Sequence, residues 1–391
     1  MAWKTVRADE FCSFVTDGTH DSPKPQSQGR KLITSKHLKG DYIDFDSANW
    51  ISEGDYQKII ARSAVEQWDI LFSMIGTIGT IYLEKNPIVE YACKNMGVFK
   101  FAGNAENAFW MYYYLKSPQA KGYIQSHLRG STQAYVPLGS LREMPVSIPD
   151  RETRNRIVSL LKPFDEKIAT NRAINDNLLE QMQAIYKSWF VDYLPFGGVM
   201  PESWTKTGIY SLANIIYGAP FASKQFNTEG HGKPIIRIRD LKDQQFATYT
   251  TEVHPKGYLL RPGDIVVGMD GEFRPYIWGN DEAWLNQRVC VFENKRPKGK
   301  AFLYFTIKPL LYAIEQTQVA TTVIHIGKKD YDAFEIMLPD AATLDSFDSL
   351  TAPMIMQIVS NSFENKRLAV MRDALLPKLM SGEIDVSDVQ L

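Results

Sequence analysis

The sequence predicts an α+β fold in which two mixed α/β globular domains alternate with two long helices that pack as an antiparallel coiled coil. Short motifs recur in the same order about 190 to 203 residues apart, which indicates a pseudo-two-fold internal repeat. Two stretches carry apolar side chains at spacings of three and four, as amphipathic helices do. We place the globular domains at residues 1–150 and 195–340, the central helix at 151–194 and the C-terminal helix at 341–391.

The repeat is visible in four pairs of matched positions. They are 29–38 with 232–241, 69–76 with 264–271, Asn95-x-x-Val98 with Asn286-x-x-Val289, and Pro149 with Pro339. The offset falls from 203 to 190 along these pairs, as expected if loops differ in length between the halves. Any one match is weak, but the shared order supports duplication of a whole domain.

Apolar runs bounded by glycine and proline predict the local elements. Strands are expected at 97–101, 264–267 and 288–292, and a helix at 109–115 whose three tyrosines lie in the core. Each long helix contains a proline at the same point, Pro163 and Pro353, which predicts a shared kink or a short leading turn.

Asparagines interrupt the apolar seam of each long helix at the same register, Asn171 and Asn175 in the first and Asn361 and Asn365 in the second. In one interpretation the seam rotates and all four face solvent. In the other they meet near the middle of an antiparallel pair and fix its register, because a slipped register buries unpaired amides. Since each half holds a domain and a helix, residues 1–200 are expected to self-associate.

Composition limits the class of protein. The 44 Lys and Arg residues balance 45 Asp and Glu residues, so DNA affinity would need local patches or partner subunits. Cys12, Cys93 and Cys290 are odd in number and far apart, which excludes a disulfide framework and a zinc ribbon. No apolar run is long enough to cross a bilayer, and acidic residues occur near the start, so we expect a cytoplasmic protein without membrane contact.

The common catalytic motifs do not occur. The sequence has no GxGxxG or GxxxxGK[ST] phosphate loop, no HExxH zinc site and no GxSxG nucleophile elbow. The six histidines lack metal-ligand spacing. A DNA methyltransferase would need an Asn/Asp-Pro-Pro-aromatic loop, and in Asn86-Pro87-Ile88 an isoleucine replaces the second proline. We therefore expect no catalytic residue, no metal and no cofactor on this chain.

Four segments carry a resemblance to a known family. They are Asp17-Gly18-Thr19-His20 with Pro23 and Gly29, the turn 69–79, the passage from Lys187–Asp192 into Pro201–Trp204, and Leu375–Ile384. Together they resemble, over nearly the whole chain, the DNA specificity (S) subunit of type I restriction-modification enzymes. Residues 205–340 depart most, since Gly218–Lys224 stands where the second Asp-Gly-Thr-His would be.

The resemblance implies a non-catalytic subunit that reads a split target in double-stranded DNA, with one target-recognition domain on each half-site. It also implies that the helices recruit two methyltransferase (M) subunits, and that two restriction (R) subunits join them. S-adenosylmethionine, ATP and Mg are then expected on the partners. The M subunits could clamp the DNA and supply many phosphate contacts, which would account for the neutral charge of this chain.

Basic and polar residues in glycine-flanked loops are candidate DNA contacts, because Arg can bond guanine bidentately and Lys meets phosphate. The candidates in the first domain are His20, Lys24, Arg30, Lys31, Lys36, Thr77, Thr132 and Gln133. Those in the second are Lys224, Arg237, Arg239, Arg274, Thr321 and Thr322. Among them Arg30, Arg237 and Arg239 are the preferred base readers. A solvated face or a loop cap is the alternative for each, and a plain turn with a positive glycine φ is the alternative for Asp17–His20.

Other functions stay open at this point. One is a fused methyltransferase or nuclease whose motifs differ from the common ones. Another is a two-headed DNA- or protein-binding scaffold of a different phage-defence complex. A specificity subunit that acts in modification only is the third.

Overall fold

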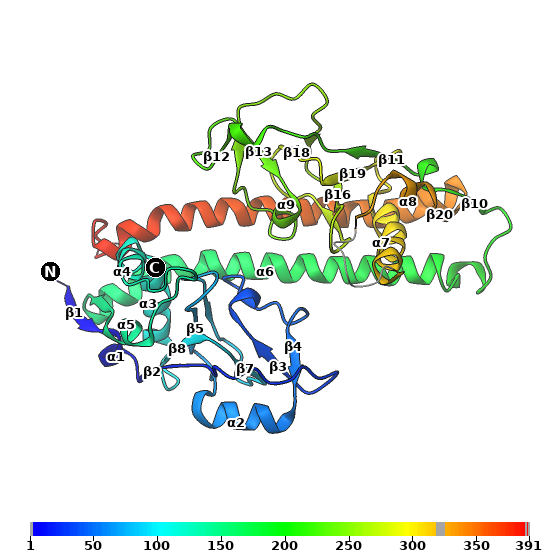
Figure 1. Cartoon of the computed structure of the whole chain (residues 1–391). Helices are drawn as coiled ribbons and strands as arrows, with labels where there is room; N and C mark the ends of the chain where they lie inside the picture. Colours follow the sequence, from blue (N-terminus) through cyan, green and yellow to red (C-terminus); the bar gives the residue numbers. More distant parts are fainter. Residues whose placement is uncertain (1–2, 318–324, 388, 390–391) are drawn as a thin grey trace. The chain divides into compact units, whose positions relative to one another are not determined.

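The computed structural model describes residues 3–317, 325–387 and 389, which form two compact units. Unit 1 comprises Met1–Ala169 with Leu368–Leu391, and unit 2 comprises Thr170–Arg367. Each unit therefore contains part of both long helices, α6 (Arg151–Phe190) and α9 (Ala341–Ser381), which are labelled in Figure 1. The region 341–391 is helical as far as Ser381, where Gly382, with a φ of +75°, ends α9.

Unit 1 consists of short strands and helices in mixed order. Its strands are β1 (Lys4–Arg7), β2 (Phe14–Asp17), β3 (Arg30–Ile33), β4 (Asn49–Ile51), β5 (Ile70–Ser73), β6 (Ile81–Leu83), β7 (Tyr91–Cys93), β8 (Met96–Lys100) and β9 (Pro145–Ile148). Its helices, besides the long ones, are α1 (Ala8–Phe11), the single turn η1 (Ser35–His37), α2 (Glu53–Ser63), α3 (Ala105–Lys116), α4 (Pro118–Ser126) and α5 (Leu138–Glu143).

The core of unit 1 lies between an antiparallel sheet of order β2-β8-β5-β6 and the helices. A second sheet joins β3 antiparallel to β4 and parallel to β7. Helix α3 is buried from Ala108 to Leu115, which explains why its sequence has no polar face. Tyr112, Tyr113 and Tyr114 are 5%, 0% and 3% exposed, so the prediction that they belong to the core is confirmed.

Unit 2 repeats this arrangement. Its strands are β10 (Thr205–Gly208), β11 (Ala213–Tyr217), β12 (Phe226–Asn227), β13 (Lys233–Ile236), β14 (Tyr249–Thr250), β15 (Leu259–Leu260), β16 (Ile265–Gly268), β17 (Pro275–Ile277), β18 (Ala283–Leu285), β19 (Val289–Asn294) and β20 (Glu335–Leu338). Its helices include η2 (Leu194–Phe196), η3 (Ile209–Ser211), η4 (Ser223–Gln225), η5 (Ile238–Asp240), α7 (Lys300–Thr317) and α8 (Lys328–Asp332). The sheet β11-β19-β16-β17 has the order of β2-β8-β5-β6, and β13 pairs with β18 in parallel as β3 does with β7.

Strand register corrects one of the sequence matches. Val98 of β8 pairs with Leu71 of β5, and Val291 of β19 pairs with Val266 of β16. The counterpart of Val98 is therefore Val291, and its match with Val289 is wrong by two residues.

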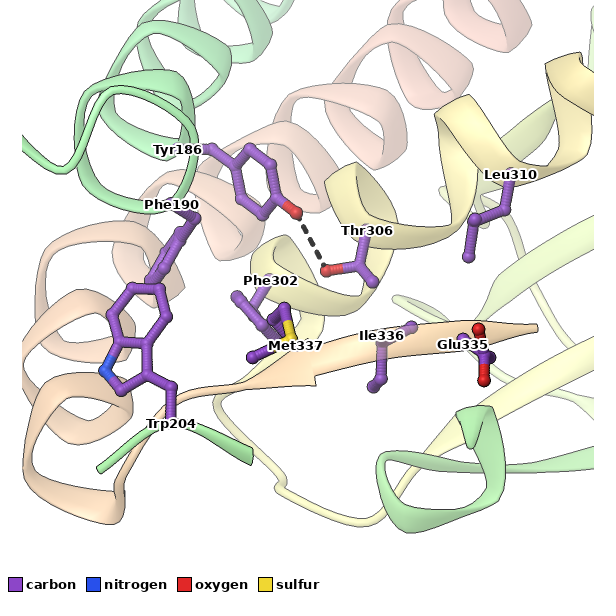
Figure 2. A pocket seen from close by; sticks show the side chains of 9 residues that line it. All are labelled: Tyr186, Phe190, Trp204, Phe302, Thr306, Leu310, Glu335, Ile336 and Met337. Atoms are coloured by element: carbon purple, nitrogen blue, oxygen red, sulfur yellow. Dashed lines mark hydrogen bonds between the residues drawn. The ribbon is translucent and has the colours of Figure 1, made fainter. Parts of the chain in front are cut away.

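An aromatic cluster packs the C-terminal end of α6 into unit 2. The ring centroids of Phe190 lie 4.8 Å from Phe302, 4.9 Å from Phe347 and 5.6 Å from Trp204. Figure 2 shows Phe190, Trp204 and Phe302 around a small cavity, with Tyr186 Oη 3.1 Å from Thr306 Oγ1. The segments Lys187–Asp192 and Pro201–Trp204 thus contribute aromatic packing.

Candidate nucleic-acid interface

Three loops of unit 1 meet at the end of its central sheet where β2 and β5 finish. Thr77 Oγ1 donates to the carbonyl oxygen of Ser35 at 3.2 Å, which ties the β5–β6 loop to η1. Ile75 forms a β-bridge with Tyr135, which ties that loop to the hairpin 129–135. We call η1, the loop 74–80 and the hairpin 129–135 the three-loop surface of unit 1. It brings Lys36, Thr77, Thr132 and Gln133 together, all of them exposed.

Unit 2 has described counterparts of two of these loops, η5 and the loop after β16. The backbone N–H of Ile326 donates to the oxygen of Met269 at 2.9 Å, as that of Val136 does to Met74 at 2.9 Å in unit 1. A Cβ on Gly268 would lie 3.2 Å from Ile238 of η5, so η5 lies against the end of β16. Thr321 and Thr322 fall outside the described residues.

Lys36 and Arg239 take the same position in the two units. Each is the second residue of a single-turn 3-10 helix, η1 or η5, and each side chain is exposed. The Arg239 side chain is 70% exposed, with its Nε 3.8 Å from Asp240 Oδ1. For the Lys36 ammonium the structure records no ion pair with any described residue. Each unit therefore presents one exposed cation from the corresponding 3-10 turn.

Similar capping holds both turns. Nδ1 of His37 accepts the backbone N–H of Thr34 at 2.8 Å in unit 1, and Asp240 Oδ2 accepts that of Arg237 at 3.0 Å in unit 2. Burial lowers the pKa of His37, which favours the neutral imidazole that can accept this bond. The side chains of His37 and Asp240 therefore hold in place the turns that present Lys36 and Arg239.

The segment Asp17–His20 is ordered by close backbone contact. A Cβ on Gly18 would lie 2.3 Å from the carbonyl oxygen of Cys93, so this position accepts only glycine without displacement of the backbone. Gly18 has no positive φ, so the reading of Asp17–His20 as a turn with a left-handed glycine is wrong. His20 is exposed and its ring nitrogens lie 2.9 Å from Asp17 Oδ2 and from Asn95 Oδ1. Gly218 is the counterpart of Gly18, since its Cβ would lie 2.0 Å from the oxygen of Asn286.

Several predicted contacts already have partners inside their own unit. Arg30 Nε lies 3.0 Å from Glu53 Oε2 and its Nη1 lies 2.5 Å from Glu90 Oε1. Lys31 Nζ donates to the oxygen of Ala48 at 2.9 Å and lies 3.9 Å from the ring centre of Trp50. To reach DNA, both side chains would have to leave these partners.

The same holds in unit 2. Arg237 binds Asp240 and the hydroxyl of Thr248, and Arg274 Nη2 donates to Glu315 Oε1 at 3.0 Å. The hydrogen bond from Arg274 lowers the pKa of Glu315. Of the three preferred base readers only Arg239 points into solvent. Lys24 and Lys224 are exposed, in the loop after β2 and in η4.

Sequence reasoning missed two exposed arginines beside the candidate loops. Arg62 of α2 donates from Nη2 to the oxygen of Gly18 at 2.7 Å, and its side chain is 57% exposed. Arg288 Nη1 lies 3.6 Å from Asp270 Oδ1 and 3.2 Å from His325 Nδ1, and it is 55% exposed. The position of Arg288, two residues after the matched Asn286, was a usable signal, whereas Arg62 gave none.

The four asparagines lie together within unit 2. Asn171 Nδ2 donates to Asn365 Oδ1 at 2.9 Å and to Glu364 Oε2 at 2.7 Å. Asn361 Nδ2 donates to Asn175 Oδ1 at 2.8 Å. Asn171 and Asn361 are 1% and 4% exposed, so the interpretation in which all four face solvent is wrong. We call these four residues the asparagine layer.

The described residues contain neither a cluster of metal-ligating side chains nor a membrane-spanning helix. Within residues 3–317, 325–387 and 389, no group of three or more His, Cys, Asp or Glu side chains is placed to hold a metal ion. No helix in that part of the chain combines the length and the hydropathy of a membrane span.

The sequence matches the family model described as "Type I restriction modification DNA specificity domain" over residues 2–180 and 201–358. It is 32% identical to the type I restriction enzyme EcoBI specificity subunit of Escherichia coli, over 48% of this chain and 40% of that protein. It is 24% identical to the MjaIX specificity subunit of Methanocaldococcus jannaschii, over 91% of this chain and 87% of the relative. A crystal structure of the S subunit of a type I system from M. genitalium aligns with a TM-score of 0.49 at 15% identity, over 96% of each chain.

Proposed function

Because the chain belongs to the family of type I restriction modification DNA specificity domains, and so serves as a DNA specificity subunit, we propose that each of its two units reads one half of a divided target. The observation that carries this proposal is that each unit presents a cation, Lys36 or Arg239, on a single-turn 3-10 helix beside the end of the strand β5 or β16. Two similar surfaces in one chain suit two half-sites. Their different cations suit two different sequences.

The chemistry of the two cations assigns them different tasks. Arg239 can present a planar fork of donors to the O6 and N7 atoms of guanine in the major groove. Lys36 presents a single ammonium, which suits a phosphate and fixes register without reading the base. Thr77, Thr132 and Gln133 of unit 1 can donate to or accept from base edges. His20, Arg62 and Arg288 border the two surfaces and suit phosphate or base contacts.

The long helices are the proposed link between reading and assembly. Within unit 2 the two helices run antiparallel, since Asn171 meets Asn365 and, further along α6, Asn175 meets Asn361. We propose that α6 and α9 pair along their length as an antiparallel coiled coil that recruits two M subunits, with two R subunits joining the complex. S-adenosylmethionine, ATP and Mg are bound by those partners in this proposal, and this chain supplies no catalytic group.

The test is selection of bound duplexes from a random-sequence library by the full chain, alone and with M subunits, followed by sequencing. Arg239→Ala should cost roughly 1–3 kcal/mol at one base position and relax preference there alone. Lys36→Ala should weaken binding evenly across sequences and reduce the salt slope by about one. Lys58→Ala and Lys298→Ala remove exposed cations that lie outside η1, η5 and the loops beside them, and serve as matched controls. Failure to enrich any sequence in the presence of M subunits would contradict the proposal.

A further inference from the structure

A buried ion pair joins the two long helices within unit 1. Arg372 Nη1 lies 2.5 Å from Asp165 Oδ1, and the two side chains are 15% and 9% exposed. Tyr113 Oη donates to Asp165 Oδ2 at 2.9 Å, and Lys116 Nζ lies 3.8 Å from that oxygen. Burial raises the pKa of Asp165, but the charges of Lys116 and Arg372 outweigh it and hold that pKa below its ordinary value. The carboxylate is therefore ionised, and its burial depends on these cations.

The internal repeat supplies a comparison within the same chain. Over the two helices the offset is 190, so Ile355 corresponds to Asp165 and Met182 corresponds to Arg372. Both counterparts belong to the core of unit 2, with exposures of 5% and 0%. Where unit 1 has a charge pair, unit 2 has two apolar side chains. The same helix positions can therefore be packed without charge.

This difference bears on which helices can pair. If two N-terminal halves paired through α6, Met182 of each copy would stand opposite Asp165 of the other. Each Asp165 would keep Lys116 and lose its arginine. Two C-terminal halves would place Arg372 opposite Ile355, without the buried carboxylate. Breaking a buried ion pair by removal of one partner is strongly unfavourable, because it leaves a charge in a poorly solvated place.

The asparagine layer makes no such distinction. Asn171 corresponds to Asn361, and Asn175 corresponds to Asn365, at the same offset of 190. In a pair of like halves, amides would still meet amides at this level. The bond from Asn171 to Glu364 would be lost in a pair of N-terminal halves, because Ile174 stands at the position of Glu364. The amide-to-amide contacts themselves are the same in matched and like halves, whereas the ion pair is not.

We propose that Asp165 and Arg372 select the pairing partner, favouring an N-terminal half with a C-terminal half and opposing the association of like halves. The partner that the seam fits is thus the other half of this chain, not a second copy of the same half. The inference rests on the helix pairing proposed above. It replaces the expectation that residues 1–200 self-associate freely.

The experiment uses the full chain with a protease site introduced into the exposed segment 197–200, between α6 and β10. After cleavage, native mass spectrometry resolves mixed pairs from the two kinds of like pair, because the halves differ in mass. Samples are followed until the ratio is constant. The variants are Asp165→Ile with Arg372→Met, which copies unit 2, and Met182→Arg with Ile355→Asp, which repeats the charge pair. Arg372→Lys keeps the charge and is the control.

The cleaved wild-type chain and Arg372→Lys should give mixed pairs almost exclusively. Both double variants remove the mismatch in like pairs, one by deleting the charges and the other by supplying complementary ones. Each should raise the fraction of like pairs at least tenfold. A wild-type chain that redistributes freely, or two folded double variants that keep only mixed pairs, would overturn the inference. Separation of the halves on cleavage in every variant would overturn the helix pairing itself and this inference with it.

Discussion

Replacement of the asparagine layer by leucine should affect stability in opposite directions, depending on how many residues are changed. A single Asn361→Leu removes the donor to Asn175 Oδ1, 2.8 Å away, and the acceptor of Gln357 Nε2, 2.6 Å away. It leaves Asn175 Oδ1 facing a leucine, whereas the exposed Gln357 can turn its amide to water. An unsatisfied buried group costs about 1–3 kcal/mol, so we expect a loss of that size in the free energy of unfolding.

Changing all four asparagines removes every amide of the layer at once. The two side chains outside the layer that lose a partner, Gln357 and Glu364, are exposed and half-buried respectively and can bond to water instead. Asn171 Oδ1 is buried and, among the described residues, has no hydrogen-bond partner, so its loss leaves no partner behind. Burial of a leucine side chain is worth about 1.5–3 kcal/mol when complete. We expect the quadruple variant to gain about 1–3 kcal/mol over the wild type, because Asn175 and Asn365 are only half-buried.

Urea unfolding of the full chain measures both effects, with Asn177→Leu on the exposed side of α6 as the matched control. Selection on duplexes whose half-sites differ in separation measures register. A slip of one heptad moves a helix by about 10 Å, which corresponds to roughly three base pairs. The quadruple variant should therefore accept more than one separation. A loss of stability equal to the sum of four single variants, or unchanged discrimination between separations, would refute the reasoning.

Three further outcomes follow from the same contacts. Burial lowers the pKa of Lys116 to about 8 in the folded chain, so between pH 8 and the ordinary value near 10.4 the Lys116 contribution to stability rises with pH. In urea titrations the free energy of unfolding of the wild type minus that of Lys116→Met should rise by up to about 3 kcal/mol over this range, because the buried thiols contribute equally to both proteins. Gly18→Ala should lower stability by about 1–3 kcal/mol in thermal melts, because the added methyl group would overpack against Cys93. Gly122→Ala in α4 is the control and should raise stability slightly; equal effects of the two substitutions would contradict the steric argument. Arg30→Ala should lower stability without altering base preference in the selection assay, because its guanidinium is held by Glu53 and Glu90.

The architecture was readable from the sequence because it depends on periodicity. The apolar residues of α6 and α9 recur every three or four positions. The strand expected at 264–267 overlaps β16, which runs from Ile265 to Gly268. The alignment of Asn95 with Asn286 failed for a local reason. One residue separates the bridge residue Lys94 from the start of β8, whereas two residues separate Asn286 from the start of β19. The match followed the identical asparagines and missed this extra residue.

The site was less predictable, because exposure depends on contacts distant in sequence. Arg30 and Arg239 both lie within seven residues after a matched glycine, Gly29 or Gly232. Arg30 is nevertheless held by Glu53 and Glu90, while Arg239 reaches solvent. Neither carboxylate lies near Arg30 in the sequence. Arg62 became a candidate only when α2 was seen to reach the oxygen of Gly18.

A chain built as a repeat must specify both the register and the partner of its helices, and an apolar seam alone specifies neither. A seam with a short period is buried about equally well after a shift of one repeat, and its two copies are interchangeable. The asparagine layer opposes the shift, because its amides bond only when they are level. The contacts between its amides do not prevent one half from replacing the other, because the asparagines occur at matched positions in both halves. Asp165 and Arg372 oppose exchange because Ile355 and Met182 replace them in the other half. Each feature supplies what the other lacks, so removal of one should leave the other's selectivity intact, and a double-mutant cycle between them should be close to additive.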